Sequence, residues 1–262
     1  MGSGAVRVQS VGLDRWRGAV GWDVWPGRPV SGPAEPCNDA VLLDFRNLFF
    51  AVADGPARSP GAARQFLEGF AEILARETGE NGALPAAPVG GGDDVQWLVG
   101  LGEEAIGEMS PGASCTFTGV WIRREAPGMT AVCIHTGDSS LWEWYPVPGS
   151  WRQRTRPNSW ALGKSRRFYQ AERFPLRPGG LLLLATDGFV DRSGLRRSDP
   201  APLLGRLHGA GCLEEMPEVA LAGTDPVGDD AAAIFLAPER VRFGAQTVVA
   251  NGPRSALQNT GD

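Results

Sequence analysis

The sequence predicts an α+β protein in which two antiparallel sheets pack together and helices flank them. Apolar segments of strand length occur in blocks along the chain, whereas two helical patterns follow one another at 61–78 and 94–108. This order does not fit the strand–helix alternation of a parallel sheet. Gly (36) and Pro (21) are abundant, which favours many turns between short strands.

The first half of the chain contains an expected β-hairpin followed by two helices. The N-terminal 36 residues carry tryptophans among glycines and prolines, and we expect short edge strands followed by a loop. AVLLDF and NLFFAVA then predict a hairpin that ends at Asp54. In 61–78 the apolar residues recur at helical spacing, and the charged residues fall on the other face. A loop rich in Gly and Pro leads to the second helical pattern, at 94–108.

The second half is mostly strand-like. SCTFTGVWI alternates in polarity, TAVCIHTGDSSLWEWY follows it, and LLLLATDGFVD is an apolar strand that ends in Asp187-Gly188. Two helical patterns near 200–222 come next, and DPVGDDAAAIFL then predicts a loop that runs into a last buried strand.

Length and charge limit the possible organisation. The 262 residues suit one large domain better than two small ones, and 42% hydrophobic residues can form a core. We expect a single domain over 1–238 and a peripheral tail over 239–262, which shows no strong pattern. The net charge of −5 argues against a nucleic-acid partner, because binding to phosphates needs a basic face.

The cysteines and the apolar segments favour a cytoplasmic protein with no membrane partner. The four cysteines are widely spaced without a CxxC pair, which favours neither a zinc site nor a disulfide framework. No signal-like segment opens the chain, and apolar runs such as Leu181–Ala185 are too short to cross a bilayer.

Four acidic residues lie at or beside the ends of expected strands. They are Asp54, Asp138, Asp187 and Asp229. Taken singly, an Asp beside a Gly favours a turn. Several carboxylates at the mouth of an apolar core repel one another and lose hydration, so they tend to be neutralised by protonation, pairing or a metal. Oxygen ligands without histidine suit Mg²⁺ or Mn²⁺ rather than zinc, and two such ions could share Asp54.

Six segments between residues 38 and 236 carry motifs in a fixed order. They are CNDAVLLD, FFAVADG, GASCTFTGVWI, AVCIHTGDSS, LLLLATDGFVD and GDDAAAIFL. In order and spacing they resemble the N-E-D, F-A-V-A-D-G, G-[ST]-T, V-G-D-S-R, L-L-L-C-S-D-G-L-x-D and D-N-x-[ST]-x-x-x-[VI] segments of a known family. This family is the metal-dependent serine/threonine protein phosphatases of type 2C, the PPM family, and the resemblance is to a divergent bacterial type.

The resemblance implies a four-layer α-β-β-α sandwich, with two antiparallel sheets face to face and helices on the outer faces. It also implies hydrolysis of phosphoserine or phosphothreonine on proteins by a water activated by two or three Mn²⁺ or Mg²⁺ ions, without a covalent intermediate. In the implied site, Asp54 bridges two ions and the Gly55 carbonyl binds one of them, while Asp187 and Asp229 complete the carboxylate shell. Asp39 orients a metal-bound water, and Asp138 helps to hold a third ion. Asp191 matches a family acid near the cluster.

The sequence departs from the family pattern around the expected phosphate site. D-G-M-G-G-H is replaced by D-G-P-A-R-S-P-G-A, so the histidine that some members use as a general acid is missing. His135 lies in an expected strand, where a packed or edge residue is a better interpretation than a proton donor. Ala34 stands where relatives carry a phosphate-binding arginine, and Asn38 replaces the glutamate of N-E-D. Arg58 could supply the missing charge, although a solvated loop arginine is the simpler interpretation.

Two basic clusters, Arg152–Arg156 and Lys164–Arg167, fall where relatives carry a variable flap. They are interpreted as a solvated face, with contact to an acidic or phosphorylated protein as the alternative. The tryptophans Trp142, Trp144, Trp151 and Trp160 are expected in the core or in hairpin packing rather than on a ligand platform.

Three functional hypotheses follow. The first is an active phosphoprotein phosphatase whose partner is a phosphorylated protein, such as the target of a serine/threonine kinase. The second is a related but weak or inactive metal-binding regulatory module, suggested by the altered loop after Asp54 and the missing arginine. The third is an unrelated α/β protein in which the Asp-Gly corners are only turns.

Overall fold

The computed structural model describes residues 18–27, 37–78, 93–125, 128–145, 150–195, 203, 206–207, 210–225 and 228–253. These residues form two antiparallel sheets, a six-stranded one in the order β11-β2-β3-β4-β5-β8 and a five-stranded one in the order β1-β10-β9-β6-β7. The strands are β1 Val20–Trp25, β2 Ala40–Asp44, β3 Phe49–Ala53, β4 Phe117–Glu125, β5 Gly128–Thr136, β6 Ser140–Tyr145, β7 Ser150–Gln153, β8 Gln170–Pro175, β9 Leu181–Ala185, β10 Ala231–Leu236 and β11 Thr247–Ala250. The helices are α1 Ala62–Glu77, α2 Asp94–Gly107, α3 Asp187–Ser193, the short 3₁₀ helix η2 Leu213–Glu215 and α5 Met216–Leu221.

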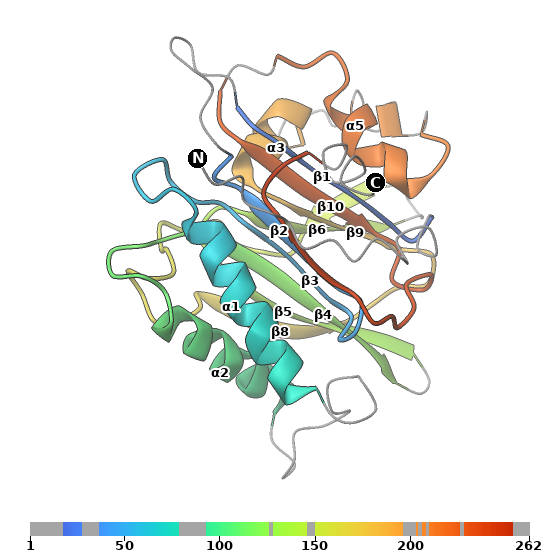
Figure 1. The fold of residues 1–262 in the computed structure, drawn as a ribbon. Coiled ribbons are helices and arrows are strands. Elements are labelled where there is room, and N and C mark those ends of the chain that lie inside the picture. The colour runs from blue at the N-terminus through green and yellow to red at the C-terminus, as the bar shows by residue number, and fades with distance from the viewer. Residues whose placement is uncertain are drawn as a thin grey trace, which may run out of the picture.

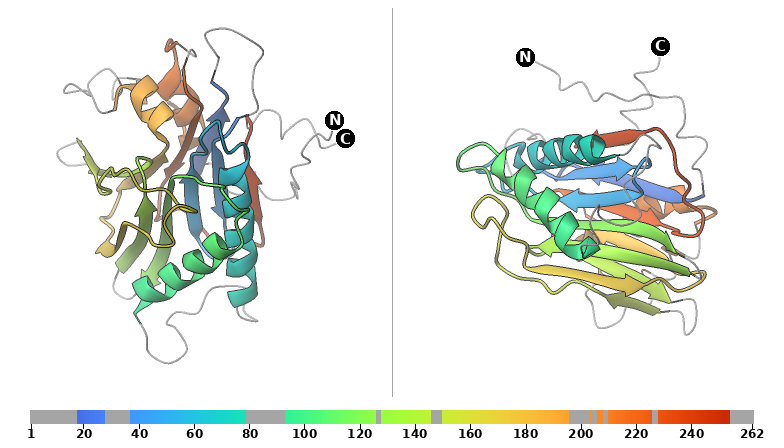
Figure 2. Two further views of the ribbon diagram at one scale, coloured as in Figure 1. Left: turned by 90° about the vertical axis from the view of Figure 1, so that its left-hand side faces the viewer. Right: turned by 90° about the horizontal axis from the view of Figure 1, so that it is seen from below.

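Three apolar clusters join these elements into four layers. One cluster fills the space between the sheets, with side chains such as Val52 from β3 and Ile234 from β10. A second packs α1 and α2 on the outer face of the six-stranded sheet, and a third packs α3, η2 and α5 on the five-stranded sheet. Figure 1 and Figure 2 show this arrangement, with the two helical layers on opposite sides of the paired sheets. The predicted α-β-β-α sandwich is confirmed.

The predicted hairpin and the first two helices are present. β2 and β3 pair with Ala40 opposite Ala53, which places Asp39 and Asp54 on neighbouring strands at the same end. The turn is closed by the Asp44 side chain, which accepts hydrogen bonds from the backbone N–H groups of Arg46 and Asn47. β1 is an edge strand, as expected. Of the two helical patterns near 200–222, the second contains η2 and α5, and the first lies largely outside the described residues.

The prediction of a peripheral tail from residue 239 needs a correction. Thr247–Ala250 forms β11, which pairs with β2 along the edge of the six-stranded sheet. Val248 and Ala250 are buried in the cluster between the sheets, so this part of the tail belongs to the domain core. Among the described residues, no helix combines the length and apolar character needed to cross a membrane.

Candidate metal centre

The expected acidic residues meet at one end of the sandwich because several strands begin or end there. Ala185, the last residue of β9, pairs with Ser140 at the start of β6 and with Ala233 near the start of β10. Asp187 follows β9, Asp229 precedes β10, and Asp138 lies in the turn between β5 and β6. The hairpin of the other sheet brings Asp54 to the same end. Residues up to 175 positions apart in the sequence are therefore neighbours.

Carboxylate oxygens of Asp54, Asp138 and Asp187 lie within 4.8 Å of one another. All three side chains are half-buried, and the group contains neither histidine nor cysteine. Asp229 is close enough for its charge to raise the pKa of both Asp54 and Asp187. Four carboxylates that converge in this way form an oxygen donor set, which is the set that Mg²⁺ and Mn²⁺ prefer.

The electrostatics of this group disfavour four free negative charges. Burial, followed by the charge of Asp187, raises the pKa of Asp54 to about 7. Burial, followed by the charge of Asp138, raises the pKa of Asp187 to about 6. Burial also raises the pKa of Asp39 well above its ordinary value and that of Asp229 in the same direction. A bound cation would remove this repulsion, so the residues fit a divalent metal site.

Asp39 is held by a threonine that the sequence analysis did not select. Its side chain is 1% exposed and accepts a hydrogen bond of 2.7 Å from the Thr186 hydroxyl. The same hydroxyl accepts a hydrogen bond of 2.8 Å from the backbone N–H of Ala232 in β10. Thr186 thereby ties Asp39 to both strands of the opposite sheet that border the site. The sequence signal is slight: a hydroxyl residue directly before Asp187-Gly188.

The glycines after Asp54 and Asp187 allow close backbone contacts. A Cβ on Gly55 would lie 2.9 Å from the carbonyl oxygen of Asn38, and one on Gly188 would lie 1.8 Å from the carbonyl oxygen of Asp230. Any larger residue at either position would push apart the strand ends that carry the carboxylates.

Asp230, next to Asp229, stabilises the backbone beside the cluster through hydrogen bonds. One of its carboxylate oxygens accepts the Gly27 N–H and the other accepts the Asn38 N–H, both at 2.6 Å. Asp230 thus fixes the segment that leads into β2, whereas Asp229 stays with the carboxylate group. Asn38, at the glutamate position of the family motif, is held here through its backbone.

The remaining candidates divide into those near the cluster and those away from it. Asp191 lies one turn after Asp187 on α3, and its charge contributes to the raised pKa of Asp187. Arg58 is exposed in the loop after Asp54. His135 is fully buried and hydrogen-bonded to Thr118 at 2.9 Å, and burial lowers its pKa to about 4, which confirms a packed residue. Ala34 and His208 lie outside the described residues.

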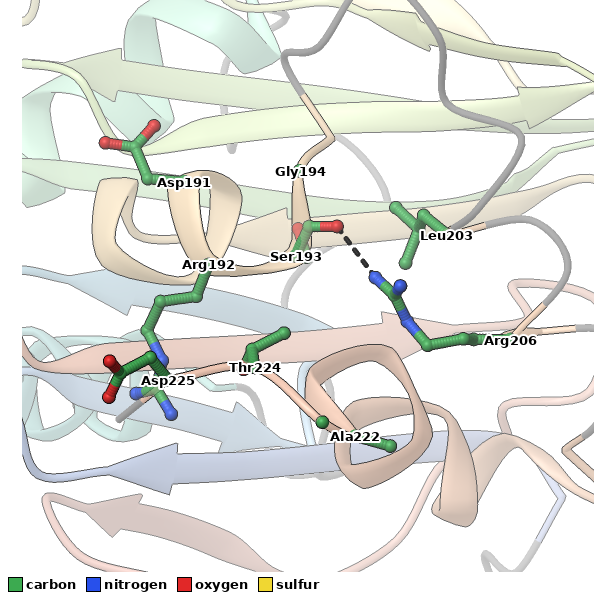
Figure 3. Close-up of a pocket in the computed structure, with 10 residues that line it drawn as sticks. Asp191, Arg192, Ser193, Gly194, Leu203, Arg206, Ala222, Thr224 and Asp225 are labelled. Carbon is green, nitrogen blue, oxygen red and sulfur yellow. Dashed lines mark hydrogen bonds between the residues drawn. The ribbon is translucent and has the colours of Figure 1, made fainter. Parts of the chain in front are cut away.

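A cavity of about 420 Å³ lies at the far end of α3, as Figure 3 shows. Arg206 on its wall donates hydrogen bonds to the carbonyl oxygens of Ser193 and Ala220, so it links α3 to α5. Arg192 faces Asp225; burial lowers the pKa of its guanidinium and the charge of Asp225 opposes this shift, while Nε and Nη1 have no hydrogen-bond partner among the described residues. Arg206 is held by structural contacts, and the carboxylate cluster, where several groups of one chemical type converge, is the better candidate site.

Solved structures match the chain over most of its length, although no protein-family model and no curated protein matches its sequence. The PPM Ser-Thr phosphatase MsPP from Mycobacterium smegmatis, in complex with cacodylate, is 19% identical, covers 83% of this chain and 97% of its own, and has a TM-score of 0.56. The catalytic domain of the serine/threonine phosphatase PstP, in complex with two manganese ions, is 19% identical, covers 88% of this chain and 99% of its own, and has a TM-score of 0.57. PppA, a regulatory component of T6SS in Pseudomonas aeruginosa, is 16% identical, covers 82% of this chain and 95% of its own, and has a TM-score of 0.59. The chain therefore has the fold of these phosphatases.

Proposed function

We propose that this protein, which has the fold of the PPM phosphatases, hydrolyses phosphoserine and phosphothreonine on proteins with the aid of two or three Mn²⁺ or Mg²⁺ ions. The observation that carries the proposal is the convergence of Asp54, Asp138 and Asp187 within 4.8 Å at one end of the sandwich. The catalytic domain of PstP, which has the same fold, is in complex with two manganese ions, and this supports a divalent metal as the proposed cofactor.

Each acidic residue has a proposed role. Asp54 would be shared between two ions, with the Gly55 carbonyl as a further ligand. Asp187 and Asp229 would complete the carboxylate shell, and Asp138 would contribute to a third ion. When bound, the ions would supply positive charge that lowers the pKa of a water and stabilises the phosphoryl oxygens. Asp39, held by the Thr186 hydroxyl, would orient the attacking water from a fixed position.

We also propose that Arg58 binds the phosphoryl group. It lines a cavity of about 300 Å³ next to the start of α1, together with Gln65 and the loop around Ser110. It lies four residues after Asp54, and its exposed side chain can reach an anion in this cavity. Unchanged kinetics of Arg58→Ala on a phosphopeptide would refute this role.

The second candidate function is a metal-binding regulatory module with little or no turnover. It is favoured by the altered loop after Asp54, where no histidine is present and the arginine is exposed. The carboxylate cluster would then bind metal without rapid hydrolysis. For either function, we propose a phosphorylated protein as the partner and the cytoplasm as the location.

The two functions are separated by one set of assays on the purified protein. We would measure hydrolysis of p-nitrophenyl phosphate and of a phosphothreonine peptide in Mn²⁺ and in EDTA, and Mn²⁺ binding by calorimetry. The variants are Asp187→Asn and the matched control Asp93→Asn, which changes an exposed helix-capping carboxylate. Turnover that requires Mn²⁺ and is lost only in Asp187→Asn supports the phosphatase. Mn²⁺ binding without turnover supports the module, and the absence of any divalent-ion binding refutes both.

A further inference from the structure

The loop between β7 and β8, residues 154–169, concentrates positive charge on an acidic protein. It contains five basic residues and no acidic one, although the whole chain has a net charge of −5. Arg154 forms an ion pair with Glu143. Arg156, Lys164, Arg166 and Arg167 are all exposed, and no carboxylate of the described residues forms an ion pair with them. We call this segment the basic loop.

The basic loop is anchored to the domain by apolar side chains. Leu162 is completely buried and pairs with Cys115 through an isolated bridge. The Phe168 ring packs against Phe117, with centroids 5.8 Å apart, and over Gly102 of α2, where a Cβ would lie only 2.5 Å from the ring. Because these residues pack against the domain, they fix the backbone of the loop, and the neighbouring basic side chains lie on the surface of the domain.

Two aromatic residues of the basic loop remain exposed. Trp160 and Tyr169 are each 45% exposed, and their rings contact each other edge to face with centroids 5.6 Å apart. Among the described residues, three large hydrophobic side chains are exposed, and two of them form this pair. The expectation that Trp160 is a core or hairpin residue is wrong, whereas Trp142 is buried and Trp144 packs on Trp151 across the β6–β7 hairpin. Exposed Trp, Tyr and Arg side chains are the types that contribute most to protein interfaces.

The basic loop begins beside the carboxylate cluster. The backbone N–H of Asn158 donates to the Gly137 carbonyl at 2.8 Å, and the Asn158 side chain accepts from the Gly137 N–H at 3.1 Å. Gly137 directly precedes Asp138. A polypeptide bound at the cluster and extended along this direction would therefore meet the exposed cations within a few residues, at about 3.3 Å per residue.

We infer that the basic loop docks an acidic segment that flanks the phosphorylated residue of a protein substrate. This inference rests on the proposed phosphatase function and adds a preference within its substrate class. Arginine and lysine would pair with Asp and Glu side chains, and the Trp160–Tyr169 pair would cover the apolar parts of the segment. A nucleic acid is less favoured because its continuous phosphates would extend past the loop over a protein of net negative charge.

The test compares binding with turnover. Binding would be measured in EDTA by fluorescence anisotropy with a labelled glutamate-rich peptide without phosphate, so that it does not depend on catalysis. Turnover would be measured with two phosphothreonine peptides that differ only in Glu or Gln at the flanking positions. The variant is Arg166→Glu with Arg167→Glu. The control, Arg240→Glu with Arg242→Glu, makes the same charge change at exposed positions beyond the opposite end of β10.

We expect Arg166→Glu/Arg167→Glu to weaken peptide binding and to lower kcat/KM for the Glu-flanked peptide, each about tenfold, as reversal of two exposed charges allows. The control variant should bind the peptide as the wild type does, and kcat/KM for the Gln-flanked peptide should change little in either variant. Trp160→Ala should also weaken binding of the glutamate-rich peptide. Equal hydrolysis of both peptides, or equal binding by variant and wild type, would overturn the inference while the phosphatase function stands. Binding that depends on the loop in a protein without turnover would support the surface and reject the phosphatase. Oligothymidine serves as the nucleic-acid probe in the same anisotropy assay. If it binds more tightly than the peptide in a way that depends on the loop, the inference that the partner is an acidic protein segment would be overturned.

Discussion

The metal-free protein should lose stability as the pH rises from 5 to 8, because burial raises the pKa of several carboxyl groups at the site, Asp54 among them. Burial, followed by the charge of Asp187, raises the pKa of Asp54 from 3.8 to about 7. Between these two values the folded protein keeps a proton that the unfolded chain has released. The stability that this proton provides is therefore complete below about pH 4 and is lost as the pH rises through 7.

The size of the effect follows from the number of pH units crossed. Each unit of difference in pKa corresponds to about 1.4 kcal/mol, so the two units between pH 5 and pH 7 cost about 3 kcal/mol. Asp187, with its pKa raised to about 6, acts in the same direction. The loss is a large fraction of the roughly 5–15 kcal/mol that stabilises a typical domain.

The assay is urea denaturation in EDTA at several pH values, followed by tryptophan fluorescence. Asp54→Asn keeps the shape of the side chain but removes the titration, so its stability should fall less steeply with pH. Asp93→Asn is the control, because Asp93 caps α2 at an exposed position and Asn caps equally well. With Mn²⁺ in place of EDTA, the wild type should regain stability at pH 8, because the proposed ions would bind the folded state alone. Equal pH slopes in wild type and Asp54→Asn, or a wild type that is more stable at pH 8 than at pH 5 in EDTA, would refute this explanation.

Two further substitutions test the packing around the site. Gly188→Ala should cost about 3 kcal/mol in urea denaturation because its Cβ would lie 1.8 Å from the Asp230 carbonyl oxygen, whereas Gly100→Ala, with open space around it, should be neutral or stabilising. A Gly188→Ala protein as stable as the wild type would contradict the close contact. Thr186→Val should cost about 1–3 kcal/mol and weaken Mn²⁺ binding in calorimetry, because the Asp39 carboxyl and the Ala232 N–H lose their shared partner. Thr186→Ser, which keeps the hydroxyl, should restore both quantities, and equal damage by the two variants would contradict this role.

The elements that the sequence predicts well are those with a strong local pattern. The hairpin over 40–53 and the helices α1 and α2 have periodic apolar residues, and all of them form close to the expected bounds. β11 is only four residues long and is stabilised by pairing with β2, about 200 positions earlier in the chain. β8, with the sequence QAERFP, has a single buried residue, Phe174, and its exposed positions are Ala171, Arg173 and Pro175, so polarity does not alternate along it. Such strands depend on partners that are distant in the sequence, and a local sequence pattern carries no information about those partners.

In the candidate site, too, features with a local sequence pattern can be predicted, whereas features that depend on distant residues cannot. Each acidic residue stands in a recognisable motif, so the carboxylate cluster could be predicted. The residues that hold it in place could not, because Thr186 acts on Asp39 across 147 positions and Asp230 acts on Asn38 across 192. For a related reason the sequence does not predict the exposure of Trp160, since Leu162 and Phe168 of the same loop pack inward against residues that are distant in the sequence.

The geometry around the two Asp-Gly pairs also distinguishes a turn from a metal site. A glycine selected for a tight turn commonly has a positive φ, but neither Gly55 nor Gly188 does. Both are required instead by backbone that passes too close for a Cβ, from Asn38 in one case and from Asp230 in the other. A turn-forming aspartate would also remain in water, whereas Asp54 and Asp187 are half-buried, and burial followed by the charge of Asp187 raises the pKa of Asp54. Turn formation alone explains neither feature, whereas the proposed divalent ion would account for the converging carboxylates.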